Sequence, residues 1–263
     1  VDGRNQGGGR AGVLIAGKAD KIRFEDVSMR CLYPTKTQAE VLCIRNKSDN
    51  ATAFVRCRFY SQQDTLLPGG GYNWFYDCYV EGDTDFIWGG NSACLFERCE
   101  VEMITSGGRG FNARVKANNI GYVFSECILT VAEGVTKCRL LEGSDGTGMV
   151  DNITFVNTTI DKEFFSGGIN SEDKSMVPIA GYDDNIIRYN KNKDEIGELG
   201  EDTGIKDGCK MYDCTYDDGK PVQESGVYGA DRIHTLTLEE YNRYFKDRST
   251  VLGGYADTTW FTE

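Results

Sequence analysis

A short pattern of apolar and polar positions recurs along this chain and predicts its fold. The pattern reads Phe-x-x-Cys-x-apolar, with close variants, at residues 54–59, 75–80, 96–101, 124–129 and 211–216, and with weaker copies at 24–29 and 155–160. In four copies the neighbours of the cysteine are mostly polar, and the chain is apolar again two positions later. This alternation is typical of a strand that buries one face, here the face that carries Cys57, Cys78, Cys99 and Cys127.

The spacing of these four cysteines indicates how the strands are connected. They follow one another at intervals of 21, 21 and 28 residues. Such an interval is too short for a crossover that contains a full helix, but it suits one coil of a β-solenoid. We therefore expect an all-β, single-domain solenoid over residues 1–263. Successive cysteines should stack about 4.8 Å apart inside it, as free buried side chains, although that separation would also permit disulfides.

Two regions depart from the repeat. Residues 161–208 are polar, acidic and without period, so we expect a long loop excursion over one face of the solenoid. Further on, Thr237 with Glu240 three residues later forms a capping-box signature for a short C-terminal helix. We expect this helix to cover the open end of the solenoid with one apolar face, made by Leu238, Tyr241 and Phe245.

Composition and charge exclude several classes of function. Apolar residues make up 40% of the 263 residues, and no run approaches the ~20 apolar residues of a membrane span. The net charge of −12 argues against a nucleic-acid partner and favours a neutral or esterified polymer over a polyanion. His234 is the only histidine, which excludes metal sites with several histidines. A Ser-His-Asp or Cys-His catalytic site would have to include His234.

The repeat also places two carboxylates in three dimensions. Asp64 lies seven residues after Cys57, and Asp85 lies seven residues after Cys78. If the two coils are in register, the aspartates occupy equivalent positions about 5 Å apart. Two stacked carboxyl groups repel each other, so one should hold its proton while the other stays ionised. That pair could supply a general acid and a nucleophile or base, or it could be two exposed turn aspartates.

The residues around this pair resemble those of a known family. QDTLL (63–67) and the segment 78–96, which contains GDTDFIWGG, resemble the pectin methylesterase signatures QDTLY and GTVDFIFGNA. The segments 38–44, 121–130 and 236–254 are also similar to that family. The resemblance implies a right-handed parallel β-helix that hydrolyses methyl esters of polygalacturonate in pectin without a metal or cofactor. It also implies a secreted protein, and we expect a monomer whose signal segment has been removed or lies upstream.

The resemblance assigns roles to residues of this sequence. It makes Asp85 the nucleophile and Asp64 the general acid, and it makes Gln38 and Gln63 hydrogen-bond donors to the developing oxyanion. Three aromatic residues could form walls for sugar rings, although packing within the coils is the alternative: Phe86, Trp88 and Trp74.

The sequence also departs from the family. Gly143 stands where members carry an arginine that orients the nucleophile, and Asp145 stands where they carry tryptophan. Arg114 replaces a family glutamine that faces the cleft. Because a guanidinium can hold both oxygens of a carboxylate, we expect Arg114 to pair with Asp85 or to bind a substrate carboxylate beside it. We also expect the family's N-terminal coils to be absent from this chain.

Three functions remain open at this point. The first is a pectin methylesterase with an altered site, and the second is a catalytically weak homologue that only binds acidic plant polysaccharide. The third is another pectin-active β-helix, such as a pectate lyase or a polygalacturonase. A polygalacturonase needs more widely separated carboxylates to admit water, so the close register of Asp64 and Asp85 disfavours it.

Overall fold

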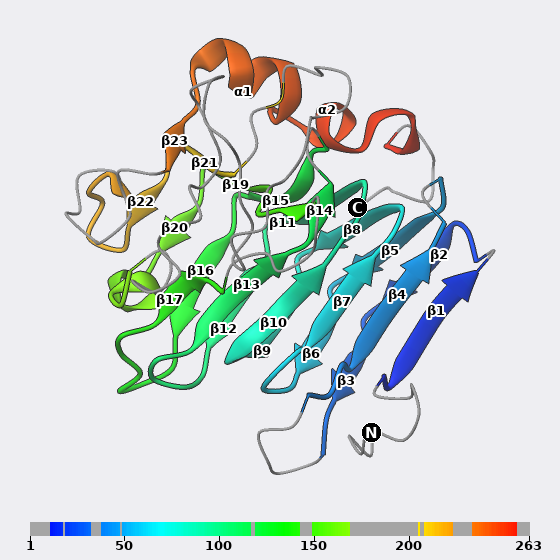
Figure 1. Cartoon of the computed structure of the whole chain (residues 1–263), viewed down its shortest axis with the longest axis horizontal. Helices are drawn as coiled ribbons and strands as arrows, with labels where there is room; N and C mark the ends of the chain where they lie inside the picture. The colour runs from blue at the N-terminus through cyan, green and yellow to red at the C-terminus, as the bar shows by residue number, and fades with distance from the viewer. Residues whose placement is uncertain are drawn as a thin grey trace.

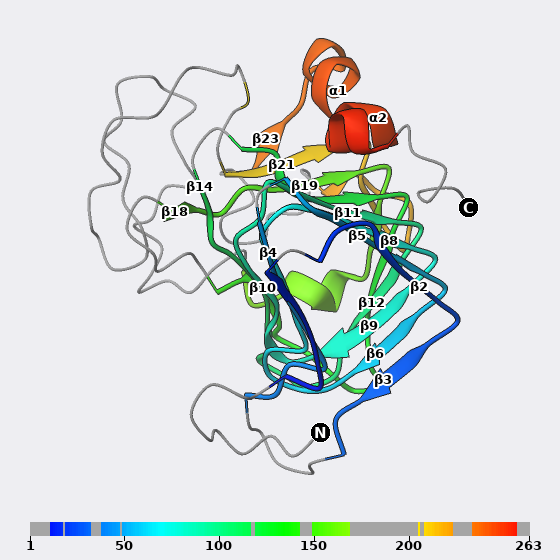
Figure 2. The same cartoon turned by 90° about the vertical axis from the view of Figure 1, so that its right-hand side faces the viewer.

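The recurring pattern folds into stacked coils in the computed structural model of the chain, which describes residues 11–17, 19–32, 38–47, 49–116, 119–142, 149–168, 205, 208–222 and 233–256. Each complete coil contributes one strand to each of three parallel sheets (Figure 1). Seen along the stack, the three sheets surround one interior (Figure 2). The predicted all-β solenoid is confirmed.

The three sheets have the following strands. Sheet A contains β1 (Val13–Gly17), β4 (Leu42–Asn46), β7 (Leu66–Gly69), β10 (Thr84–Gly89), β13 (Arg109–Ala113) and β17 (Arg139–Leu141). Sheet B contains β2 (Ile22–Glu25), β5 (Ala51–Val55), β8 (Tyr72–Tyr76), β11 (Ala93–Glu97), β15 (Gly121–Ser125), β19 (Ile153–Val156), β21 (Cys209–Tyr212) and β23 (His234–Thr235). Sheet C contains β3 (Ser28–Arg30), β6 (Arg58–Tyr60), β9 (Tyr79–Gly82), β12 (Glu100–Met103), β16 (Ile128–Val131), β20 (Thr159–Ile160) and β22 (Thr215–Tyr216). A separate antiparallel pair joins β14 (Val115–Lys116) to β18 (Met149–Val150).

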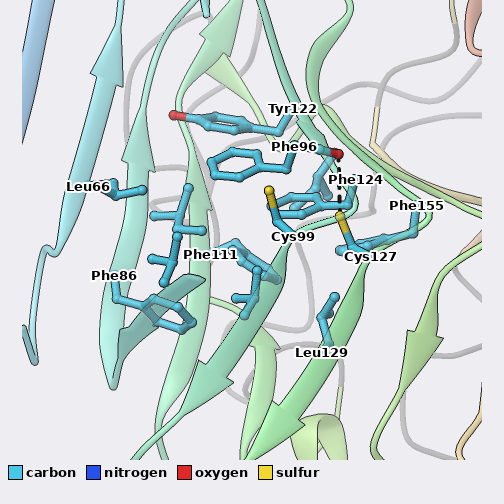
Figure 3. Packing of buried hydrophobic residues seen from close by; sticks show 14 of the residues in the cluster. Leu66, Phe86, Phe96, Cys99, Phe111, Tyr122, Phe124, Cys127, Leu129 and Phe155 are labelled. Carbon is cyan, nitrogen blue, oxygen red and sulfur yellow. Dashed lines mark hydrogen bonds between the residues drawn. The ribbon is translucent and has the colours of Figure 1, made fainter. Parts of the chain in front are cut away.

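The interior holds ladders of identical side chains. The phenylalanine rings of the repeat stack on one another from coil to coil, with neighbouring ring centroids 4.5–5.3 Å apart: Phe24, Phe54, Phe75, Phe96, Phe124 and Phe155. None of the ten cysteines is in a disulfide, and Cys57, Cys78, Cys99 and Cys127 are buried. Figure 3 shows this packing, including the hydrogen bond that the Cys127 thiol donates to the carbonyl of Phe96. The prediction of free, buried cysteines is therefore confirmed.

The repeat is not one strand, as the alternation suggested, but two strands that meet at a corner. In the first strong copy, β5 ends at Val55, Arg56 adopts a left-handed conformation with φ of +51°, and β6 begins after Cys57. The equivalent residue of the next two copies, Asp77 and Arg98, does the same. This bend is needed because residues three apart in a straight strand face opposite sides, whereas the phenylalanine and the cysteine both face inward.

The C-terminal helix is present, but it does not cover the end of the solenoid. Helix α1 (Leu238–Tyr244) begins with the predicted capping box, and α2 (Arg248–Leu252) follows it. Both lie against the outer face of sheet B (Figure 2). Phe245, Val251 and Leu252 are buried there, whereas Leu238 is 61% exposed. These helices therefore cover the outward-facing apolar residues of sheet B and not the last coil.

The predicted excursion at 161–208 lies mostly outside the described residues. Its first part forms a 3₁₀ helix, η1 (Lys162–Phe165), from which Phe164 is buried against Phe111. A second 3₁₀ helix, η5 (Gly253–Tyr255), follows α2. Within the described residues no helix is long and apolar enough to cross a membrane.

Candidate active site

The two aspartates lie side by side where sheet A begins on adjacent coils. The 21-residue register between these coils pairs Leu66 of β7 with Ile87 of β10, and the same offset relates Asp64 to Asp85. The backbone N–H of Asp64 donates to the carbonyl of Thr84 over 3.0 Å. The register predicted from the cysteine spacing is therefore present, and neighbouring strands place the two backbones about 4.8 Å apart.

Both aspartates adopt a left-handed backbone conformation. Asp64 and Asp85 have φ values of +62° and +49°, a region in which aspartate is enriched but which costs an L-residue about 1–2 kcal/mol. The register of β10 against β13 shifts just beyond Thr84. As a result of this bulge, Phe86 and Ile87 are both buried in the core although they are adjacent in sequence.

One residue that the sequence did not identify contacts the pair. Asn112, which is fully buried, donates from Nδ2 to Oδ2 of Asp85 over 3.2 Å. Asp64 is 3% exposed, and Asp85 is half-buried. The register shift between β10 and β13 brings Asn112 opposite Trp88. The repeat in the sequence does not show where such a shift occurs, so Asn112 could not be predicted from spacing.

The two glutamines lie on the same side of the coils as Asp64. Gln63 directly precedes Asp64 and is half-buried, whereas Gln38 is exposed one coil earlier. The coils are joined here because the backbone N–H of Ala39 donates to the carbonyl of Gln63 over 3.2 Å. Both glutamines therefore flank the strand starts of sheet A, with Gln63 on the coil nearer to Asp85.

Two of the three residues predicted as aromatic walls are fully buried instead. Trp74 is fully buried on the outer face of sheet B, where its Nε1 donates to Glu97 over 2.9 Å and Arg248 lies 4.0 Å from its ring centroid. Phe86 is fully buried inside the coils, 5.7 Å from Phe111. The prediction is wrong for both, because Trp74 lies on sheet B beneath the C-terminal helices and Phe86 faces the interior at the bulge.

Trp88 and Arg114 do lie together on that outer face. Both are half-buried, and the guanidinium carbon of Arg114 lies 5.0 Å from the ring centroid of Trp88. This is within the range of a cation–π contact. The expected alternatives for Arg114, a pair with Asp85 or a substrate carboxylate, stay predictions, and Gly143 and Asp145 lie outside the described residues.

Beyond Arg114 the strand ends of sheet A enclose a polar pocket of about 320 Å³. Arg114 and Lys116 line it together with asparagine, serine and glycine residues: Asn46, Gly70, Gly71, Gly90, Asn91, Ser92 and Asn119. Nearby, Tyr122 donates from its hydroxyl to the carbonyl of Gly89 over 3.0 Å. Burial raises the pKa of Tyr122, so its hydroxyl stays protonated as a donor behind the end of β10.

The described residues contain no cluster of three or more histidine, cysteine, aspartate or glutamate side chains that could hold a metal ion. What the site offers is a pair of carboxyl groups in different surroundings. Asp64 is enclosed, whereas Asp85 is more open and holds a hydrogen bond from an amide. Such a pair can combine an ionised nucleophile with a proton donor.

Comparison with known proteins agrees with these features. Residues 12–138 match the Pectinesterase family model. "Pectinesterase 31" of Arabidopsis thaliana is 33% identical over 126 residues, which cover 46% of this chain and 37% of the relative. "Probable pectinesterase 56" of the same plant is 27% identical over 155 residues, which cover 51% and 54%. The chain thus spans well under two thirds of the length of these curated relatives.

Solved structures extend the similarity in fold over nearly the whole chain. Pectin methylesterase PemA from Erwinia chrysanthemi superposes with a TM-score of 0.64 at 19% identity and covers 95% of this chain and 74% of its own. The pectin methylesterase from carrot gives 0.66 at 14% identity and covers 97% and 72%. These proteins are right-handed parallel β-helices, so the predicted fold class is confirmed. The chain is a right-handed parallel β-helix whose residues 12–138 are similar to the pectinesterase family.

Proposed function

We propose that this protein removes methyl esters from galacturonate residues of pectin. The observation that carries the proposal is the placement of Asp64 and Asp85 on adjacent coils, within the segment that matches the Pectinesterase model. The aspartates occupy the positions that the family resemblance assigns to its catalytic pair. A protein of this kind acts on plant cell-wall polymer, so we also propose that it is secreted and works as a monomer.

The proposed reaction has two steps. Asp85 attacks the ester carbonyl carbon, and the tetrahedral intermediate collapses as Asp64 protonates the methoxy oxygen and methanol leaves. Asp85 is then joined to the galacturonate through an anhydride. Asp64, now ionised, takes a proton from water, and the hydroxide opens the anhydride to regenerate Asp85 and release the free carboxylate.

The surroundings of the pair support this division of roles. Asn112 donates to one oxygen of Asp85, which helps to fix the orientation of the carboxylate. Gln38 and Gln63 lie beside the pair as the proposed donors to the oxyanion. Trp88, with Arg114 stacked against it, is the aromatic surface proposed for a sugar ring, and Arg114 is the proposed partner of a substrate carboxylate.

A second function, binding without turnover, has one observation in its favour. Gly143 stands where the family resemblance expects an arginine that orients the nucleophile. In this chain the amide of Asn112 donates to Asp85. A neutral amide holds a carboxylate less strongly than a guanidinium does, so a site of this kind could bind pectin and turn it over slowly.

One assay separates the candidate functions. Purified protein is incubated with highly esterified pectin, and the methanol, the unsaturated uronate absorbance and the new reducing ends are all measured. The proposal predicts methanol alone. Unsaturated product would indicate a lyase, and reducing ends would indicate a glycoside hydrolase. Pectin binding without any of the three products would favour the binding function.

A further inference from the structure

A buried hydroxyl beside the two aspartates has no role in the chemistry described above. Thr65 directly follows Asp64 and is fully buried. The register of β4, β7 and β10 gives its position to Val41 on the coil before and to Phe86 on the coil after, and both of these are core residues. A polar group at an otherwise apolar interior position is costly unless it is hydrogen-bonded. The partner of the Thr65 hydroxyl therefore shows what it contributes.

The hydroxyl joins two successive coils. Oγ1 of Thr65 lies 2.8 Å from the carbonyl oxygen of Glu81 on the next coil and 3.4 Å from that of Gln62 in its own turn. A hydroxyl has one proton to donate, and the shorter contact makes the better hydrogen bond, so Thr65 donates to Glu81. Glu81 belongs to β9, which leads through a short turn into β10 and Asp85. The bond thus fastens the residue after Asp64 to the segment before Asp85.

Backbone hydrogen bonds connect the same two turns. The N–H of Asp64 donates to the carbonyl of Thr84 over 3.0 Å, and the N–H of Asp83 donates to the carbonyl of Gln62 over 2.9 Å. Asp64 has a φ of +62°, a conformation that an L-residue keeps only when its surroundings hold it. Thr65 adds a side-chain hydrogen bond to this set. A substitution can therefore remove that one bond and leave the backbone donors in place.

We propose that Thr65 is a positioning residue that fixes the spacing of the Asp64 and Asp85 carboxyl groups. The inference rests on the proposed function and adds a residue to it. Attack by one aspartate and proton transfer by the other must take place on the same ester, so a small displacement of either carboxyl slows the reaction. Because Thr65 is fully buried, it does not touch the substrate and acts through the backbone of its neighbour.

The test begins with Thr65→Val, which removes the hydroxyl and keeps the shape of the side chain. We expect kcat for methanol release to fall about twentyfold while KM stays within about twofold, because the reacting groups are displaced and no binding contact is lost. Thr65→Ser keeps the hydroxyl and should keep kcat within about threefold of wild type. A serine variant as slow as the valine variant would overturn the inference.

The matched control is Thr158→Val, at the corner between sheets B and C. Thr158 is 1% exposed, and its hydroxyl lies 3.2 Å from the carbonyl oxygen of Phe124 on the neighbouring coil. Each valine variant loses one buried hydroxyl, so the two should lose similar amounts of thermal stability, but Thr158→Val should keep the wild-type kcat. An equal loss of kcat in both variants would overturn the inference, as would an unchanged kcat in Thr65→Val.

Amide hydrogen exchange keeps this inference separate from the proposed function. Exchange of the Asp64 backbone N–H, followed by NMR, reports without any substrate how firmly the turn is held. We expect it to be at least about tenfold faster in Thr65→Val than in wild type, and unchanged in Thr65→Ser and Thr158→Val. If wild type releases no methanol but shows this difference, the function fails and the positioning role stands. If the Asp64 N–H exchanges equally in Thr65→Val and wild type, the positioning role fails.

Discussion

At the scale of single residues, the orientation of the Asp85 carboxylate depends on a hydrogen bond from Asn112. Asn112 is fully buried, and its amide donates to Asp85. Asp85 itself sits at a bulge with a positive φ, which costs the fold some stability but sets the direction of the side chain. Bulges and left-handed residues are often found next to active sites for this reason. Asn112 is thus a positioning residue for the proposed nucleophile.

Replacing Asn112 with alanine should slow the reaction more than it weakens binding. We expect kcat for methanol release to fall about tenfold with KM within about twofold, because the carboxylate of Asp85 would lose its fixed direction. Asn73→Ala is the matched control, since Asn73 is a buried asparagine on sheet B that accepts a hydrogen bond from Thr52. The control should keep kcat unchanged. An equal fall in both variants would point to a general loss of structure.

The sequence predicted some members of this site and missed others for physical reasons. Asp64 and Asp85 could be paired because each follows a repeat cysteine at the same distance, and no register shift intervenes. Asn112 lies beyond a shift in register, so spacing alone could not place it. The sequence predicted that Trp74 lines the cleft. An aromatic residue in a strand does not reveal whether solvent or another element of the fold covers its side chain. Here the covering layer is a helix from the far end of the chain.

At the scale of elements, one buried contact fastens the C-terminal helices to the solenoid. Arg248, the first residue of α2, pairs with Glu97 of β11 over 3.0 Å and stacks on Trp74. Glu97 also accepts the indole N–H of Trp74. The side chains of Arg248 and Glu97 are only 20% and 19% exposed. Removing either partner would leave the other charge poorly solvated.

The variant Arg248→Ala should therefore destabilise the fold. We expect the free energy of unfolding to fall by about 1–2 kcal/mol, because the pair is mostly shielded from water but not fully buried. The midpoint of thermal unfolding should fall by about 3–6 °C, as followed by circular dichroism. Arg243→Ala removes an exposed arginine from α1 and should change the midpoint little. A similar fall in both variants would contradict the role of the buried contact.

The start of α1 should make stability depend on pH. Burial disfavours the charged form of Glu240, but hydrogen bonds from Thr237 and the contact with His234 outweigh it, so the pKa of Glu240 is lowered. A carboxyl whose pKa falls on folding stabilises the protein above its unfolded pKa, about 4.3, and this contribution is lost as pH falls through the lower folded value. The stability difference between wild type and Glu240→Gln should therefore shrink below about pH 4.5.

Thermal unfolding of wild type and Glu240→Gln from pH 7 to pH 3 measures this difference. Glu239→Gln, in the exposed neighbouring position, serves as the control and should show no such trend. A difference between wild type and Glu240→Gln that stays constant across the range would mean that the ionised carboxylate does not stabilise the helix start.

At the scale of the whole molecule, stability comes from repeated contacts between like positions of successive coils. The stacked phenylalanines and the buried cysteines run through the interior. The sequence predicted this stack because each coil repeats the same few buried residues. It could not predict the corner within each repeat, since a left-handed residue such as Arg56 or Asp77 has no distinctive side chain. Nor could it predict which sheet the C-terminal helices cover.

The interior location of the thiols leads to a prediction for the whole chain. Burial raises the pKa of Cys209 and of Cys214 to about 12 each, and Cys94 and Cys99 are likewise raised by burial. At pH 8 these thiols should react slowly in the native state. Ellman titration should find about one fast thiol, the half-buried Cys31, and all ten after unfolding without reductant. Fewer thiols after unfolding would indicate disulfides.

The proposed reaction begins with the attack of Asp85 on a methyl ester. It is tested most directly by the initial rate of methanol release from esterified pectin by wild type and by Asp85→Asn, with circular dichroism to confirm that both are folded. We expect wild type to release methanol and Asp85→Asn to release it at least about a thousandfold more slowly, since an amide cannot form the acyl intermediate. An Asp85→Asn rate within about tenfold of wild type would contradict it.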